Sequence, residues 1–263
     1  MDVMAIVIAT AVVAVIGLIV GLGLGLFGEK FKVEVDEKEM AVREELPGNN
    51  CGGCGYAGCD ALAKAIAAGE APVNACPVGG APVGERIAAI MGVQAQAGEK
   101  KVAFVKCSGT CDKAKVKYQY AGILDCAKAT VAPGSSPKAC SAGCMGFGSC
   151  VKACAFDAIH VEDGVAVVDQ EKCVACGKCV AACPNKLIEL VPYKAEHRVR
   201  CNSHEKGKAV KEVCVAGCIG CTLCTKQCEF DAVHMENNLA VIDYEKCTNC
   251  GKCAAKCPVK VIS

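Results

Sequence analysis

Hydrophobic and polar positions divide the chain sharply near its N-terminus. From Val3 to Phe27 every residue is apolar or small, and none is charged. About 20 such residues are enough for a helix to cross a bilayer. No basic residue precedes the stretch, and it is longer than the apolar core of a signal peptide, which favours a retained helix over a cleaved signal. The pattern therefore predicts a transmembrane helix over residues 1–28.

The charged residues on either side of this helix indicate its orientation. Lys30 and Lys32 follow it closely, whereas only Asp2 precedes it. Because cytoplasmic flanks carry the excess of Lys and Arg, we expect a single-pass protein of the cell membrane with its N-terminus outside and its later residues in the cytoplasm. One face of the helix carries small residues that suit packing on another membrane helix, although membrane helices are rich in glycine generally. These residues are Gly17, Gly21 and Gly25.

Three short regions follow the apolar segment. Residues 29–46 are mostly charged and predict a spacer. Residues 47–80 are rich in glycine and cysteine, include a short helix expected over 60–69, and predict a compact unit. Residues 81–100 predict a linker that contains one short helix.

The remainder of the chain is a tandem repeat with a period of 74 residues. The segment AFDAIHVEDGVAVVDQEKC of the first copy matches EFDAVHMENNLAVIDYEKC of the second. In each segment apolar residues alternate around a turn pair, Asp163-Gly164 or Asn237-Asn238, which predicts a β-hairpin. We therefore expect two units, 101–197 with an N-terminal extension and 198–263.

Composition shows why such a chain needs something other than an ordinary core. It contains 25 cysteines in 263 residues, only 4% aromatic residues and no Trp. So few large side chains cannot fill a core of this length to native density. The formal net charge of +1 gives no case for nucleic acid binding.

The cysteine spacing indicates iron–sulfur clusters. Each copy contains the run C-x₂-C-x₂-C-x₃-C-P, which begins at Cys173 and at Cys247. In bacterial ferredoxins three thiolates of this run hold one [4Fe-4S] cluster and the fourth holds its neighbour. Zinc sites also use C-x₂-C pairs, but they do not need the further C-x₂-C interval of this run. The fold class is therefore α+β, made of small iron–sulfur modules after an N-terminal transmembrane helix: a four-cysteine domain and two tandem two-cluster ferredoxin-like units.

The spacing groups twenty cysteines into five cluster sites. One set in the first copy departs from the rule, because Phe147 stands where the second copy has Cys221; Cys140 is the expected substitute, and a three-cysteine cluster is the alternative. The five sets are Cys51, Cys54, Cys59 and Cys76; Cys140, Cys144, Cys150 and Cys183; Cys154, Cys173, Cys176 and Cys179; Cys218, Cys221, Cys224 and Cys257; and Cys228, Cys247, Cys250 and Cys253.

Five further cysteines leave room for a sixth cluster. Some of them can equally be buried thiols, which behave as small hydrophobes. We therefore expect five or six [4Fe-4S] clusters as the cofactors. The five remaining residues are Cys107, Cys111, Cys126, Cys201 and Cys214.

The order of these parts resembles a known family. An apolar N-terminal helix, the segment CGGCGYAGCDALAKAIAAGEAPVNACPVGG and the ferredoxin modules together resemble the B subunit of the Rnf electron-transport complexes, in the long form with two tandem two-cluster units. The resemblance implies an electron-carrying subunit of a membrane-bound ferredoxin:NAD⁺ oxidoreductase coupled to Na⁺ or H⁺ translocation. It also implies other Rnf subunits as partners and soluble ferredoxin as the electron donor.

The residues themselves limit what this chain does. It has no dinucleotide-binding fingerprint and no catalytic constellation of its own, and its apolar helix carries no charge that could move an ion. We therefore expect a carrier of electrons only. The alternatives are a relay subunit of another membrane oxidoreductase and a membrane-tethered redox sensor.

Lysine-rich segments are candidates for docking an acidic electron donor. Charged loops are usually only solvated, but a basic surface near a cluster would steer such a donor. The two segments carry Lys113, Lys115 and Lys117, and Lys206, Lys208 and Lys211.

Overall fold

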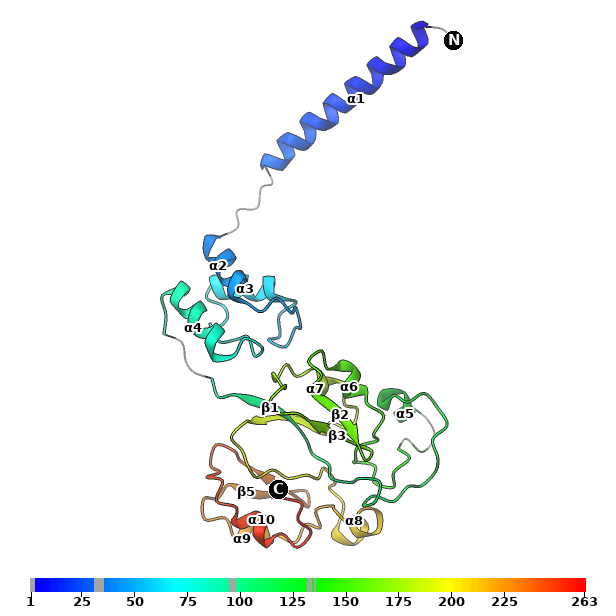
Figure 1. Ribbon diagram of the computed structural model, residues 1–263, viewed down its shortest axis with the longest axis vertical. Coiled ribbons are helices and arrows are strands. Elements are labelled where there is room, and N and C mark those ends of the chain that lie inside the picture. Colours follow the sequence, from blue (N-terminus) through cyan, green and yellow to red (C-terminus); the bar gives the residue numbers. More distant parts are fainter. Residues whose placement is uncertain (1–2, 31–35, 95–97, 132–133, 135) are drawn as a thin grey trace.

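The computed structural model describes the chain except for residues 1–2, 31–35, 95–97, 132–133 and 135. Helix α1 (Val3–Lys30) stands apart from the rest of the protein (Figure 1). Its side chains over residues 11–27 are exposed, apart from the half-buried Gly23. Over the residues that the structure describes, no helix is both long enough and apolar enough to cross a membrane.

The next part is a three-helix module. Helix α2 (Glu37–Glu45) packs on both α3 (Cys59–Ala67) and α4 (Gly80–Met91). Val42 of α2 and Ile87 of α4 are fully buried in its core, where they remove apolar surface from water.

This module is larger than the compact unit expected from the sequence. The predicted spacer 29–46 contains α2, whose first turn is capped by Asp36 accepting from the Lys38 N–H at 2.9 Å. The helix expected in the linker 81–100 is α4, which covers the same core. Both segments therefore belong to the fold because their few apolar residues are buried in it.

The two ferredoxin-like units share one plan, a hairpin with a short helix on either side. The predicted turns are confirmed: Asp163 and Gly164 have φ of 46° and 74°, and Asn237 and Asn238 have φ of 46° and 69°. In order, the elements are α6 (Ser149–Ala153), β2 (Ile159–Glu162), β3 (Val165–Val168) and α7 (Lys178–Ala182), and then α9 (Leu223–Lys226), β5 (Val233–Glu236), β6 (Leu239–Ile242) and α10 (Lys252–Lys256).

A second strand pair covers the first unit and was not predicted. Strand β1 (Lys101–Val105) pairs antiparallel with β4 (Ile188–Pro192), so that Val105 lies opposite Ile188 (Figure 1). The apolar sides of β1 and β4 pack on the core of the first unit, which also contains cysteine side chains. The pair therefore closes one side of that unit.

Extended segments join the two units across the boundary predicted at 197/198. Ala114 forms an isolated antiparallel β-bridge with Cys214 of the second unit, and Val116 forms another with Lys138 of the first. The N-terminal extension of the first unit therefore lies between the segment at Cys214 and the segment at Lys138. Helix α5 (Cys126–Val131) lies within that extension, and α8 (Gly207–Val213) leads into Cys214. The ferredoxin-like units are thus connected by backbone hydrogen bonds as well as by the chain.

Candidate metal centres

The structure gathers twenty cysteines around five cavities, four at each, and brings three more together beside α3. None of the cysteines is in a disulfide. We number the groups in their spatial order and name them by these thiols: site 1, Cys54, Cys59 and Cys76, with Cys51 assigned to it from the spacing; site 2, Cys154, Cys173, Cys176 and Cys179; site 3, Cys126, Cys144, Cys150 and Cys183; site 4, Cys107, Cys140, Cys201 and Cys214; site 5, Cys218, Cys221, Cys224 and Cys257; site 6, Cys228, Cys247, Cys250 and Cys253.

Site 1 lies in the three-helix module, at the start of α3. The Cys59 N–H donates to Asn50 Oδ1 at 2.8 Å, which fixes the loop before the helix. Burial raises the pKa of the Cys76 thiol, while the backbone N–H groups of Gly79 and Val78 lower it. The nearby thiols Cys59 and Cys54 also raise this pKa, which shows that the three sulfur atoms lie close together.

Sites 2 and 3 share the two short helices of the first unit. Helix α6 carries Cys150 to site 3, and Cys154 at its C-terminal end reaches site 2. Helix α7 does the reverse, with Cys179 in site 2 and Cys183 in site 3. Four residues of helix span about 6 Å, so each helix links two neighbouring sites.

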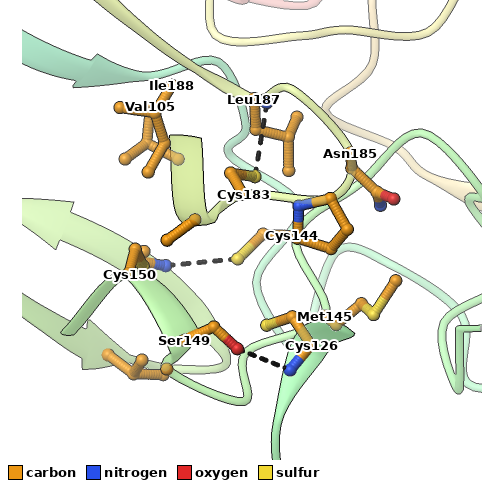
Figure 2. Close-up of a pocket in the computed structure, with 15 residues that line it drawn as sticks. Val105, Cys126, Cys144, Met145, Ser149, Cys150, Cys183, Asn185, Leu187 and Ile188 are labelled. Carbon is orange, nitrogen blue, oxygen red and sulfur yellow. Dashed lines mark hydrogen bonds between the residues drawn. The ribbon is translucent and has the colours of Figure 1, made fainter. Parts of the chain in front are cut away.

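Site 3 differs from the expected set. Figure 2 shows Cys126, Cys144, Cys150 and Cys183 around one cavity, whereas Cys140 lies elsewhere. The pKa of Cys150 is raised to about 12, chiefly by burial and in addition by the other three thiols. The Cys126 N–H donates to Ser149 Oγ at 2.7 Å, which holds the start of α5 against α6.

The reason for the difference lies at Phe147. Its ring packs on Tyr120 with centroids 4.9 Å apart, so this position supplies packing instead of a thiol. Cys126, on the helix of the N-terminal extension, supplies the fourth sulfur in its place. No spacing rule relates Cys126 to Cys144, so sequence reasoning missed this ligand.

Site 4 takes Cys140 together with thiols from both units. The pKa of Cys140 is raised to about 11, chiefly by burial and in addition by Cys107, Cys201 and Cys214. Cys140 and Cys214 are repeat-equivalent positions, and the structure places them in one site.

Two positive side chains line the site 4 cavity. Lys138 is 5% exposed, and its Nζ donates to the carbonyl oxygens of Gly109 at 2.7 Å and Gly164 at 2.6 Å. The Nε of Arg200 is buried and has no hydrogen-bond partner in the part of the chain that the structure describes. A cavity with four thiols and two cations is suited to an anionic group.

Sites 5 and 6 repeat the arrangement of sites 3 and 2 in the second unit. Cys224 of α9 lies in site 5 and Cys253 of α10 in site 6. The pKa of Cys224 is raised to about 11, chiefly by burial and in addition by Cys218 and Cys221. The structure therefore brings together the two sets that the spacing grouped in this copy.

Backbone N–H groups point at the sulfur atoms of these sites. The Leu187 N–H donates to Cys183 Sγ at 3.4 Å, and the repeat-equivalent Val261 N–H donates to Cys257 Sγ at 3.4 Å. The Ala103 N–H of β1 donates to Cys173 Sγ at 3.3 Å. Such bonds stabilise thiolates, and bonds to sulfur also set the potentials of iron–sulfur clusters.

The cavities test whether [4Fe-4S] clusters fit these residues. Each of sites 2 to 6 surrounds a space lined mainly by thiols and apolar groups. Within the described ranges, no three acidic, histidine or cysteine side chains are close enough to hold a single metal ion. The donor set, four thiols at separate positions around each space, fits a cluster.

The remaining candidate residues lie outside these sites. Cys111 is exposed, and its sulfur lies against the hairpin turn at Gly164. The two lysine-rich segments lie side by side, because Lys115 N–H donates to the Val213 carbonyl at 2.9 Å and Val215 N–H to the Lys113 carbonyl at 3.0 Å. Their six lysines are not buried, and Lys113, Lys115 and Lys117 are all exposed.

Family models match three parts of the chain. Residues 46–78 match the FeS family, described as an Fe-S cluster; residues 166–189 match the 4Fe-4S binding domain; and residues 217–262 match the 4Fe-4S dicluster domain. All four thiols of site 4 lie outside the matched ranges.

Curated relatives match nearly the whole chain. The B subunit of the Na⁺-translocating ferredoxin:NAD⁺ oxidoreductase complex of Acetobacterium woodii is 48% identical over 260 residues, covering 98% of this chain and 78% of the relative. The B subunit of an ion-translocating oxidoreductase complex of Methanosarcina acetivorans is 44% identical, covering 96% of each chain. The B subunit of the proton-translocating ferredoxin:NAD⁺ oxidoreductase complex of Clostridium ljungdahlii is 43% identical, covering 95% of this chain and 89% of the relative. The chain therefore belongs to the B-subunit family of ion-translocating Rnf oxidoreductase complexes.

Proposed function

We propose that this chain is the electron-carrying subunit of a ferredoxin:NAD⁺ oxidoreductase that translocates Na⁺ or H⁺. The observation that carries the proposal is the set of five four-thiol sites, together with the thiols of site 1, on a chain of this family. Bound [4Fe-4S] clusters would each accept and release one electron. The protein contributes thiolate ligands, backbone N–H groups that stabilise them, and apolar walls that exclude water.

The proposal assigns six clusters, one to each site. Five sites correspond to the sets expected from the spacing, with Cys126 in place of Cys140. The sixth is site 4, which includes Cys107, Cys201 and Cys214 from the cysteines that the spacing left over. Cys111 is not a ligand in this assignment.

Contacts between neighbouring sites support one continuous relay from site 1 to site 6. A Cβ on Gly53 would lie 2.8 Å from the Cys176 carbonyl oxygen, so the loops of sites 1 and 2 touch. The Cys144 N–H of site 3 donates to Cys107 Sγ of site 4 at 3.4 Å. The Cys218 backbone N–H of site 5 also lowers the pKa of Cys201 in site 4, a pKa that burial chiefly raises.

The N-terminal helix supports attachment to the membrane. This part of the proposal rests on the uncharged run from Val3 to Phe27, which lies within a helix of 28 residues. About 20 such residues are enough to cross a bilayer. The flanking lysines favour cytoplasmic iron–sulfur modules. Added Cβ atoms at Gly17, Gly21 and Gly25 would meet nothing within 4 Å, so this face is open for another membrane helix of the complex.

A soluble ferredoxin is the proposed donor, and the combined lysine segments are its proposed docking surface. The bridge between Ala114 and Cys214 places both segments directly on site 4. Asp112, Glu205 and Glu212 lie among the lysines and reduce the charge without reversing it. An acidic donor would therefore be steered toward a cluster ligand.

Iron analysis tests the proposal directly. Protein purified without oxygen should contain about 24 iron atoms and as much acid-labile sulfide per chain, at four per cluster. Reduced ferredoxin should bleach the cluster absorbance. Iron near 12 per chain, or zinc in place of iron, would contradict the assignment.

A further inference from the structure

Lys138 is one of two buried charged residues in the described part of the chain, the other being Arg198, and it is the one that lines a thiol site. The side chain is 5% exposed, and its two hydrogen-bond acceptors are the neutral carbonyls of Gly109 and Gly164. It forms no ion pair with a carboxylate in the described part of the chain, although other lysines there do. A buried charge without a counter-ion is strongly destabilising, so an anion is needed nearby.

The groups around Lys138 identify where that anion lies. Lys138 lines the site 4 cavity, and Gly164 belongs to the hairpin whose Ala166 N–H donates to Cys144 Sγ of site 3 at 3.4 Å. Burial chiefly raises the pKa of Cys144 and of Cys214, and the Lys138 charge lowers both. The ammonium group is therefore placed between two thiol sites.

The same cavity contains a second cation with an unsatisfied group. Arg200 lines site 4, and its buried Nε has no partner among the described residues. Two cations without carboxylate partners at one thiol-lined space point to an anionic occupant of that space. A [4Fe-4S] cluster with four thiolates carries a negative charge in both its oxidised and its reduced state, and reduction adds one more.

We propose that Lys138 is a fixed counter-ion for the clusters of sites 3 and 4 and raises their reduction potentials. This inference rests on the cluster assignment made above. A nearby positive charge stabilises the reduced cluster more than the oxidised one, because the reduced cluster is more negative. The electron is supplied by the external reductant, and no bond of the lysine changes.

The repeat shows that this charge is specific to the first unit. The position 74 residues after Lys138 is Glu212, an exposed residue of α8. Sites 5 and 6 therefore have no counterpart of this buried ammonium group at the equivalent position. The effect of removing Lys138 should be confined to sites 3 and 4.

A potentiometric titration followed by electron paramagnetic resonance tests the proposal on the full chain. We expect Lys138→Met to lower the equilibrium constant for one-electron reduction of two clusters by about tenfold. For one electron this corresponds to a decrease of about 59 mV in each reduction potential. Lys138→Arg keeps the charge and should keep both potentials. Lys101→Met is the matched control, since it removes an exposed lysine of the same unit.

Iron content separates the possible outcomes. If Lys138→Met binds less iron, Lys138→Gln is measured instead, because it can still donate to one carbonyl. Unchanged potentials in a fully loaded neutral variant, or an equal shift in Lys101→Met, would overturn the proposal. If the wild-type chain holds about 20 iron atoms, the sixth cluster fails, but the shift at site 3 still tests Lys138.

Discussion

Replacement of Cys140 by serine tests the least expected part of the site assignment. The spacing predicted that Cys140 holds a cluster with Cys144, whereas the structure places it with Cys107, Cys201 and Cys214. Cys140→Ser should therefore remove the cluster of site 4 and leave site 3 intact. Cys126→Ser should do the opposite.

The structure sets the size of the effect. Loss of one cluster lowers the iron content from about 24 to about 20 per chain. Cys140→Ser removes one of the four thiolates proposed to hold this cluster, so the remaining three thiols are expected to hold it only weakly.

The assay combines iron analysis with rapid reduction by ferredoxin. Cys111→Ser is the matched control, because Cys111 is exposed and lies outside the six sites. It should retain all the iron and the wild-type rate, whereas Cys140→Ser should lose one cluster and be reduced more slowly. Full iron in Cys140→Ser, or equal losses in the two variants, would refute the ligand set of site 4.

The modules and their contacts support three further predictions. Removing iron with a chelator should abolish cooperative thermal unfolding of the ferredoxin-like units, because their cores include cluster thiols; an unchanged melting curve would refute this. Gly53→Val should slow electron transfer between sites 1 and 2, since a Cβ at this position meets the Cys176 backbone. Gly98→Ala should leave the rate unchanged, because the nearest atom to its added Cβ is 3.6 Å away, and equal rates in the two variants would refute the contact. Charge reversal of either lysine segment should slow reduction by ferredoxin and flatten its salt dependence, while reversal of three exposed lysines of the second unit should not. These control lysines are Lys226, Lys256 and Lys260.

Local signals explain what could be predicted from the sequence. The hairpin turns are encoded by Asp163-Gly164 and Asn237-Asn238, which accept positive φ. The ferredoxin-like spacing is also local, because one short helix fixes two ligands four residues apart. These features need no knowledge of distant segments.

The features that the sequence did not reveal depend on long-range packing. Strand β1 pairs with β4, which lies far along the chain, and no alternation in so short a strand identifies that partner. Helix α2 is mostly charged, and only its position against α3 buries Val42. Cys126 reaches site 3 because the extension folds back on α6, which no cysteine spacing records.

The position of site 4 gives the tandem repeat a physical meaning. Duplication of a two-cluster unit would produce two separate electron carriers unless something lay between them. Site 4 draws Cys107 and Cys140 from the first unit and Cys201 and Cys214 from the second, and it touches site 3 through Cys144 and site 5 through Cys218. The two lysine segments that meet at Cys214 cover the same site. A cluster in site 4 would both connect the two units and lie at the proposed point of electron delivery. The doubled chain would then carry electrons as one relay.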